Sequence, residues 1–333
     1  MIIKSDTIAK LCNFYQYRLK AKELVIFAIR GCLPVATLSG NFNCITSFHS
    51  SHQLIGVKPN YQTARCTIGL WDQQRQKVAV FPGSTLPSKK YLFSNITSVE
   101  TFNILCPGKY ELRKGVHPRN GGFQQHDALL MDGYAIVKIP KVERLLTTIK
   151  FSGKHKYSVL LPGDNLHAAR TEPTMMSDTA CTEMLMFNYS SSGCITIAGQ
   201  PAAYVKNGQP YAEWNYWQHF ISVLQKESGN QTHYDFVLFD HSDFKLPQTN
   251  RHLSVRYGSE SKQVENIQFL LNSIINSTTG LAYYSHEITN KLGRLAAEAY
   301  LNFDRDFNKR EGSPEIKLQQ FFKQTKHFYS SFN

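Results

Sequence analysis

The stretch TARCTIGLWDQQRQKVAVFPGS, residues 63–84, contains two apolar runs, TARCTIGLWD and KVAVFPGS, which end at an aspartate and at a Pro-Gly-Ser turn. Short runs of this kind, bounded by Pro, Gly, Asn or Asp, are typical of β-strands. The pattern recurs in YAIVKIP (134–140), YSVLLPG (157–163) and YDFVLFD (234–240). The sequence therefore predicts a β-rich region from about residue 50 to 200, with one more strand returning to its sheet.

Helical periodicity marks both ends of the chain. Apolar residues recur at near-helical spacing over about 5–22, before an extended run over 23–31. A helix is predicted over 212–228, strand signals stop after Asp243, and two helical patterns follow over 261–275 and 286–307. These changes predict an N-terminal helical segment (1–21), a β-rich domain (22–249) and a small all-helical domain (250–333), an α+β fold.

Composition bounds the class of protein. With 333 residues, 42% of them hydrophobic, the chain can bury a sizeable core, and two domains are the default expectation. Lysine and arginine number 37 against 25 acidic residues, a net charge of +12 that favours polyanionic surroundings such as nucleic acid, acidic lipid or cell-wall polymer. The sequence contains no helix-turn-helix, zinc-finger or RNA-recognition signature, so no nucleic-acid partner is expected.

The seven cysteines are an odd number, scattered, and contain no C-x-x-C pair. We therefore expect no disulfide framework, no metal site and no cofactor. The first 35 residues lack the pattern of a secretory signal, and their best apolar run is cut by Arg30, so no transmembrane segment is predicted. The chain is expected to be made in a reducing cytoplasm and to need another export route if it acts elsewhere.

One cysteine has a context suited to catalysis. In FNYSSSGCITIAG, residues 187–199, Cys194 follows Ser192 and Gly193 at a turn before a strand-like run. A thiol reacts as thiolate, so its pKa must be lowered by a neighbouring base or by backbone dipoles. His167, in LLPGDNLHAAR (160–170), follows a strand-like run and is the candidate base. The Gly193 and Cys194 amides are candidates to hold a developing oxyanion.

The order NLHAA then SSSGCITI resembles the L,D-transpeptidase catalytic domain, whose signature is a strand-end histidine followed by a Ser-x-Gly-Cys turn. The segments VIFAIRGCLP, TIGLWD, VFPGSTLPS and PGKYELRKG are also similar to uncharacterised bacterial members, and the resemblance covers roughly residues 22–205. Two features depart from the family. The interval between His167 and Cys194 is long, which implies an inserted loop around 170–184, and Ser192 stands where many members have a second histidine.

The resemblance implies a β-rich fold, a cysteine thioester intermediate and peptidoglycan stem peptides as acyl donors. Cys194 would attack a carbonyl while His167 takes and later returns the thiol proton. Asp164, Asn165 or a backbone carbonyl would orient His167. In the loop HPRNGGFQQH, His117, Arg119 and His126 are either surface residues or substrate contacts.

The segment LSVRYGSESKQVENIQFLLNSI, residues 253–274, resembles the first helix of a three-helix peptidoglycan-binding domain. The matching positions are Gly258, Ser259, Val264, Gln268, Leu271 and Asn272, and a second apolar face is predicted at Thr289, Leu292, Ala296 and Phe303. A plain helical pair shows the same apolar spacing, and both interpretations stay open.

These observations predict cysteine-dependent acyl transfer or hydrolysis on peptidoglycan stem peptides, as transpeptidase, carboxypeptidase or endopeptidase. One version is a bacterial toxin or lytic protein, delivered to the periplasm or outside the cell by a secretion apparatus and countered by an immunity partner. The alternatives are a wall-binding module without catalysis, and a cysteine enzyme acting on another protein or amide.

Overall fold

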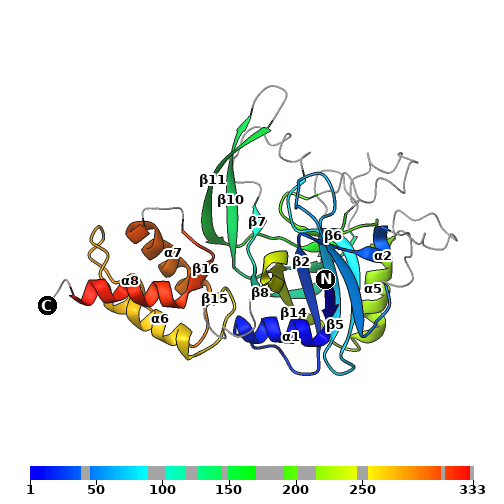
Figure 1. The fold of residues 1–333 in the computed structure, drawn as a ribbon, viewed down its shortest axis with the longest axis horizontal. Helices are drawn as coiled ribbons and strands as arrows, with labels where there is room; N and C mark the ends of the chain where they lie inside the picture. The colour runs from blue at the N-terminus through cyan, green and yellow to red at the C-terminus, as the bar shows by residue number, and fades with distance from the viewer. Residues whose placement is uncertain are drawn as a thin grey trace.

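The protein has a mixed α+β, β-rich fold in the computed structural model. The structure describes residues 1–38, 46–88, 103–117, 126–144, 149–169, 191–201, 215–245, 254–308 and 312–330. A closed β-barrel occupies one side of the molecule and the C-terminal helices the other (Figure 1).

Eight strands form the barrel in the order β12-β13-β6-β5-β2-β14-β8-β9. The pairs β12/β13 and β14/β2 are parallel, and the other neighbours are antiparallel. Closure comes from the pairing of Leu166 on β12 with Leu129 on β9. The strands are β2 (Leu24–Arg30), β5 (Cys66–Asp72), β6 (Lys77–Ser84), β8 (Gly108–His117), β9 (His126–Leu130), β12 (Leu166–Ala168), β13 (Ile195–Ile197) and β14 (His233–Asp240).

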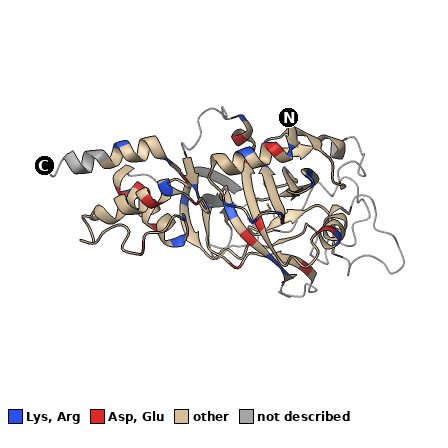
Figure 2. Ribbon diagram, turned by 90° about the horizontal axis from the view of Figure 1, so that it is seen from below, with Lys and Arg blue, Asp and Glu red and all other residues tan. Residues whose placement is uncertain are grey.

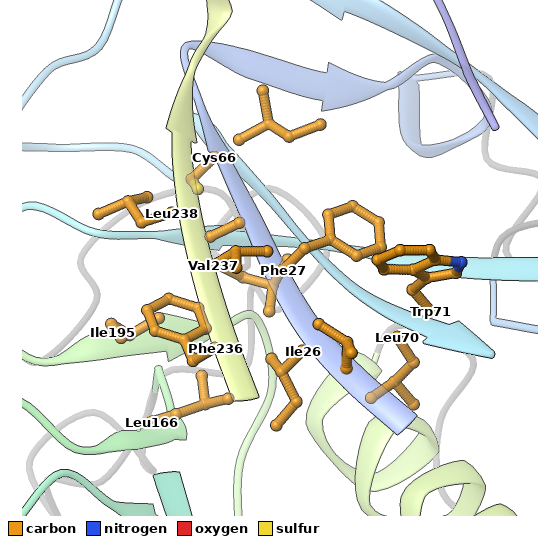
Figure 3. Close-up of a cluster of buried hydrophobic side chains, with 14 of the residues drawn as sticks. Ile26, Phe27, Cys66, Leu70, Trp71, Leu166, Ile195, Phe236, Val237 and Leu238 are labelled. Carbon is orange, nitrogen blue, oxygen red and sulfur yellow. The ribbon is translucent and has the colours of Figure 1, made fainter. Parts of the chain in front are cut away.

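The barrel closes around a large apolar core. The central strand β2, LVIFAIR, is buried at every position except Arg30, because both of its edges and both of its faces are covered. Figure 3 shows Phe27 of β2, Phe236 of β14 and Leu166 of β12 within this cluster. The strands predicted from CTIGLWD, KVAVFPGS and YDFVLFD are confirmed as β5, β6 and β14. Their apolar side chains are buried on both faces of the sheet, as continuous apolar runs require.

Further elements flank the barrel. They are β1 (Ile2–Lys4), β3 (Cys32–Pro34) and β4 (Ser51–Gly56), which form a sheet in the order β1-β4-β3, and the helices α1 (Ser5–Phe14), α2 (Val35–Leu38) and α5 (Tyr216–Glu227). The helix predicted to run to about residue 22 ends at Phe14. Gln16 has a φ of 59°, and Tyr17 pairs with Ser259 in an isolated bridge, so tertiary pairing overrides the helical period.

A long hairpin projects from the barrel (Figure 1). It consists of β10 (Ala135–Arg144) and β11 (Ile149–Leu160), with the short β7 (Ile104–Leu105) on the other edge of β10. The predicted strand YAIVKIP begins at Ala135, and the strand predicted over YSVLLPG ends at Leu160, two residues before Pro162. Proline cannot donate a ladder hydrogen bond, which is consistent with this end.

The C-terminal segment has a hydrophobic core of its own. It contains β15 (Ser254–Arg256), α6 (Lys262–Ser273), α7 (Arg294–Asn308), β16 (Glu315–Lys317) and α8 (Leu318–Ser330). The prediction of an all-helical segment is wrong, because β15 and β16 pair and bury Val255 and Ile316. The helix predicted over 286–307 begins only at Arg294, directly after Gly293, and α8 was not predicted.

A buried ion cluster joins this segment to the barrel. The Arg256 guanidinium donates to both carboxylate oxygens of Asp243, at 2.8 and 2.9 Å, and to Glu315 at 2.6 Å. It lies 3.9 Å from the ring centre of Tyr15, whose hydroxyl donates to Asp243 at 2.8 Å. Ser259 Oγ donates to the Tyr15 carbonyl at 2.6 Å, so each group in the cluster has a defined partner.

Charged residues are interspersed over the rest of the ribbon. Figure 2 shows basic and acidic residues scattered over both the barrel and the C-terminal segment. Of the helices in the described ranges, none has both the length and the apolar run that a bilayer crossing requires. The five described cysteines, which are Cys12, Cys32, Cys66, Cys106 and Cys194, are free thiols.

Candidate functional site

Four adjacent barrel strands bring one cysteine and three histidines together. In the order β13-β12-β9-β8, Cys194 precedes β13, His167 is the middle residue of β12, His126 begins β9 and His117 ends β8. Leu166 and Ile195 point into the core (Figure 3). Because side chains alternate along a strand, His167 and Cys194 lie on the outer face, where His117 and His126 form a direct cross-strand pair.

The cluster is compact. A ring nitrogen of His117, a ring nitrogen of His167 and Sγ of Cys194 all lie within 4.8 Å of one another. The ring centres of His117 and His126 are 5.1 Å apart and stacked, and His167 meets these rings edge-on at 4.8 and 5.9 Å. The predicted pair of His167 and Cys194 is thus brought together by the fold, despite its long separation in sequence.

A backbone carbonyl orients His167. Its Nδ1 lies 2.7 Å from the Ala168 carbonyl oxygen, which can only accept, so Nδ1 carries the proton and Nε2 keeps a lone pair. Burial lowers the pKa of His167 well below its ordinary range, and the neighbouring His117 and His126 lower it further. The imidazole is therefore neutral near pH 7, the form that can accept a proton or bind a cation.

The Cys194 thiol does not have the low pKa that the sequence analysis required of a nucleophile. The side chain is 9% exposed. Burial raises the pKa of the thiol to about 12, and the nearby Asp164 carboxylate adds to this rise against the opposing backbone amides of Asn165 and Cys194. The core thiols Cys66 and Cys106 have a similar pKa of about 12, so proximity to imidazole nitrogens, and not acidity, distinguishes Cys194.

Asp164 is a buried carboxyl beside this thiol. Burial raises its pKa to about 8, against a hydrogen bond from the Asn103 amide at 3.3 Å that lowers it. Its second oxygen, Oδ2, has no hydrogen-bond partner within the described ranges. Gly193 lies so close that an added Cβ would meet Asp164 Oδ1 at 2.6 Å and the Asn103 amide nitrogen at 2.9 Å. The Ser-Gly-Cys turn therefore needs glycine for this close approach.

The turn itself is held by hydroxyl and backbone contacts. The Gly193 amide donates to Ser191 Oγ at 3.2 Å, and that hydroxyl donates to the Cys194 carbonyl at 2.8 Å. The Ser192 carbonyl accepts from the backbone N–H of Asn103 at 3.3 Å, a different donor from the Asn103 side chain that bonds Asp164. An oxyanion at this turn has to compete with Ser191 for the Gly193 amide, and the oxyanion role of Gly193 and Cys194 stays a prediction.

The remaining predicted site residues have different surroundings. Asn165 does not contact His167 in any hydrogen bond of the described residues. Its side-chain oxygen accepts from the Met131 amide at 3.1 Å, which ties β12 to the end of β9. His126 is buried at 6% exposure within the cluster, not on a surface loop. Arg119 and the loop over 170–184 lie outside the described residues.

The positions that resemble a peptidoglycan-binding domain mostly have packing roles. Gln268 is fully buried, accepts from the Thr289 amide at 2.6 Å and donates to the Lys291 carbonyl at 2.9 Å. Asn272 donates to the Tyr284 carbonyl at 2.8 Å. Gly258 has a φ of 85°, and an added Cβ would lie 2.4 Å from the Lys109 carbonyl oxygen on the barrel. Gly258 thus packs against β8 of the barrel, and Ser259 donates to the Tyr15 carbonyl after α1.

Comparison with known proteins adds no family: no protein-family model, curated protein or solved structure matches the chain significantly. The functional interpretation of the site is therefore argued from its geometry.

The residue that sequence reasoning undervalued is His117, which it treated as a loop residue. A usable signal was present, because His117 and His126 bracket a Gly-rich stretch and such a stretch can place its two ends opposite each other across a hairpin.

Proposed function

We propose that the protein is a cysteine acyltransferase or peptidase of the L,D-transpeptidase type that acts on peptidoglycan stem peptides. The observation that carries this proposal is the convergence of Cys194 and His167 at one end of the barrel, within 4.8 Å between sulfur and ring nitrogen. The sequence order of histidine and Ser-x-Gly-Cys turn supports the same assignment.

The described geometry supports a general-base mechanism starting from a neutral pair. His167 keeps a lone pair on Nε2, and Cys194 keeps its proton. As Sγ attacks the donor carbonyl, the thiol proton passes to His167 and the carbonyl oxygen becomes an oxyanion. Collapse expels the leaving amine, which takes the proton from His167, and leaves a thioester. An amine or water then releases the acyl group from Cys194.

The raised thiol pKa has a kinetic consequence. Because transfer of a proton from Cys194 to His167 is unfavourable before substrate arrives, the free protein holds its nucleophile in the unreactive form. We infer that a stem peptide, by placing its carbonyl against Sγ, couples loss of the thiol proton to formation of the sulfur–carbon bond, which supplies the driving force for transfer. Thiol-directed probes should therefore label Cys194 slowly in the absence of substrate.

The test is incubation of the full chain with purified peptidoglycan fragments, followed by mass spectrometry. The wild type should give cleaved or exchanged stem peptides and a transient acyl adduct on Cys194, and Cys194→Ala should give neither. Cys106→Ala is the matched control, since that thiol is also buried with a pKa of about 12 but lies in the core. Equal turnover by wild type and a folded Cys194→Ala variant would exclude this nucleophile.

A second function has a specific observation in its favour. The burial and raised pKa of Cys194 also suit a wall-binding module that has lost catalysis. The C-terminal segment then supplies the binding surface, and Ile275 and Leu281, exposed at 57% and 68% beside the turn at 276–280, are its candidate contacts. In that case wild type and Cys194→Ala sediment equally with insoluble peptidoglycan without product, and Leu281→Ser weakens sedimentation.

A further inference from the structure

Whatever reaction the protein catalyses, His117, His167 and Cys194 together offer the ligand atoms of a transition-metal site. Two imidazoles and one thiolate are ligands that Zn²⁺ prefers, and zinc with three protein ligands keeps a fourth position open. The three donors come from β8, β12 and the turn before β13, so the barrel positions them without any C-x-x-C spacing. The sequence-based expectation of no metal site rested on the odd number and scatter of the cysteines and on the missing C-x-x-C pair, and it did not consider ligands brought together from distant strands.

We propose that His117, His167 and Cys194 bind a single Zn²⁺ ion at the end of the barrel. The donors lie within 4.8 Å of one another, and tetrahedral zinc with its usual bond lengths separates such donors by about 3.3 to 3.6 Å. His117 is the last residue of β8 and Cys194 directly precedes β13, so closing this difference requires side-chain adjustment at two strand ends only.

The surroundings of His167 support the assignment independently. A metal-bound histidine commonly donates its second ring N–H to a carbonyl, which fixes the ring and its tautomer. His167 Nδ1 makes this bond to Ala168 at 2.7 Å and leaves Nε2 for the metal. The His126 ring, stacked on His117 at 5.1 Å, limits how far His117 can turn away.

Binding has a defined proton balance. Zn²⁺ displaces the proton of the Cys194 thiol, which passes to solvent, and binds the neutral imidazoles through their lone pairs, so one proton is released per metal. Zn²⁺ and an acyl donor need the same sulfur, and the metal-bound and acylated forms exclude each other. The metal site goes beyond the proposed function and does not require it, but it makes zinc an inhibitor of acyl transfer.

The experiment is a titration of the full reduced chain with Co²⁺, a spectroscopic substitute for Zn²⁺, followed by competition with Zn²⁺. We expect about one Co²⁺ per chain, a thiolate-to-cobalt absorption band in the near-ultraviolet, and its loss when Zn²⁺ is added. Cys194→Ser should remove the band, and His117→Ala should weaken binding by about 100-fold or more, since outer-shell losses alone cost about 10- to 100-fold. His155→Ala, whose ring packs on Tyr157 in β11, is the matched histidine control and should bind as wild type does.

Either a band that persists in Cys194→Ser or unchanged affinity in His117→Ala would place the metal elsewhere and overturn the proposal, as would the absence of binding at roughly 10 μM metal. Zinc-edge X-ray absorption on the wild type needs no variant and should report one sulfur at about 2.3 Å with nitrogen ligands at about 2.0 to 2.1 Å. Acyl transfer is tested separately, by measuring turnover of peptidoglycan fragments with protein from which a chelator has removed any metal. Failure of one proposal therefore leaves the other measurable.

Discussion

Two buried polar clusters of this molecule differ in how their groups are satisfied. Around Arg256, a bidentate pair with Asp243, two bonds to Glu315 and the Tyr15 ring surround one guanidinium. Around Cys194, the thiol is next to a carboxyl whose Oδ2 has no hydrogen-bond partner within the described ranges, and to His167, an imidazole whose charged form burial disfavours. The first arrangement stabilises an interface, whereas the second retains groups that can still react or bind.

Burial of polar groups serves two purposes in these clusters. A buried charge that is paired on every side holds two parts of the chain in a fixed relation, and removing one partner leaves the other uncompensated. Buried groups with perturbed pKa values and open bonding capacity are instead typical of functional sites. The following variants test whether the two clusters differ in this way.

The largest effect is expected for His167→Ala at saturating peptidoglycan fragment. Loss of the general base should lower the rate about 10²- to 10⁴-fold, because His167 is the assigned acceptor of the Cys194 proton. His126→Ala is the control, since it removes an imidazole of the same cluster without touching the predicted proton path. Turnover of the two variants is measured by mass spectrometry. A larger loss of rate in His126→Ala than in His167→Ala would assign the general base to His126 on β9.

Arg256→Ala should destabilise the protein by about 3 to 5 kcal/mol, because it leaves Asp243 buried and uncompensated at the interface. Urea unfolding followed by circular dichroism measures the change in the free energy of unfolding. At urea concentrations below the unfolding transition, the rate at which a thiol reagent labels Cys194 should match that of the wild type, since the two clusters are separate. A loss under about 1 kcal/mol would show that the interface does not depend on this cluster.

Asp164→Asn should stabilise the protein at alkaline pH by about 1 to 3 kcal/mol. With its pKa raised from 3.8 to about 8, Asp164 retains in the folded chain a proton that the unfolded chain releases, so wild-type stability falls as pH rises from about 4 to 8. Asparagine does not titrate, and its advantage should grow across this window. Thermal unfolding at pH 5 and pH 8 tests this, and a constant difference would contradict it.

Asp164→Asn should also change the reactivity of the Cys194 thiol. Because the Asp164 carboxylate raises the pKa of Cys194, its removal should speed alkylation of Cys194 above pH 8, where wild-type Asp164 is ionised. Below pH 7 the two proteins should react at similar rates. Peptide mapping after timed alkylation distinguishes Cys194 from the core thiols.

The smallest effect is expected for Lys20→Ala. Its ammonium pairs with Glu111 at 3.2 Å, but the side chains are 45% and 55% exposed. Exposed pairs contribute about 0 to 1 kcal/mol, and they weaken further with salt. Urea unfolding at low and high salt should find a difference from wild type below about 1 kcal/mol. A loss comparable with that of Arg256→Ala would mean that burial does not set the ranking.

The sequence by itself determined the elements whose pattern is local. Continuous apolar runs such as CTIGLWD and KVAVFPGS are strands because they must be buried on both faces, and the period of α6 places Val264, Gln268 and Leu271 on one inner face. The order of His167 and the Ser-Gly-Cys turn also indicated a candidate reactive pair before any fold was known.

Tertiary structure alone decided how those elements meet. Closure of β12 on β9 gathers residues 117, 126, 167 and 194 into one cluster, and no local pattern encodes pairing between strands so distant in sequence. It also decided the helix end at Phe14, the β15/β16 pair and the need for glycine at Gly258, each set by contact with another part of the chain. The physical reason is that pKa and donor geometry at Cys194 follow from burial and neighbours, which exist only once the barrel has closed.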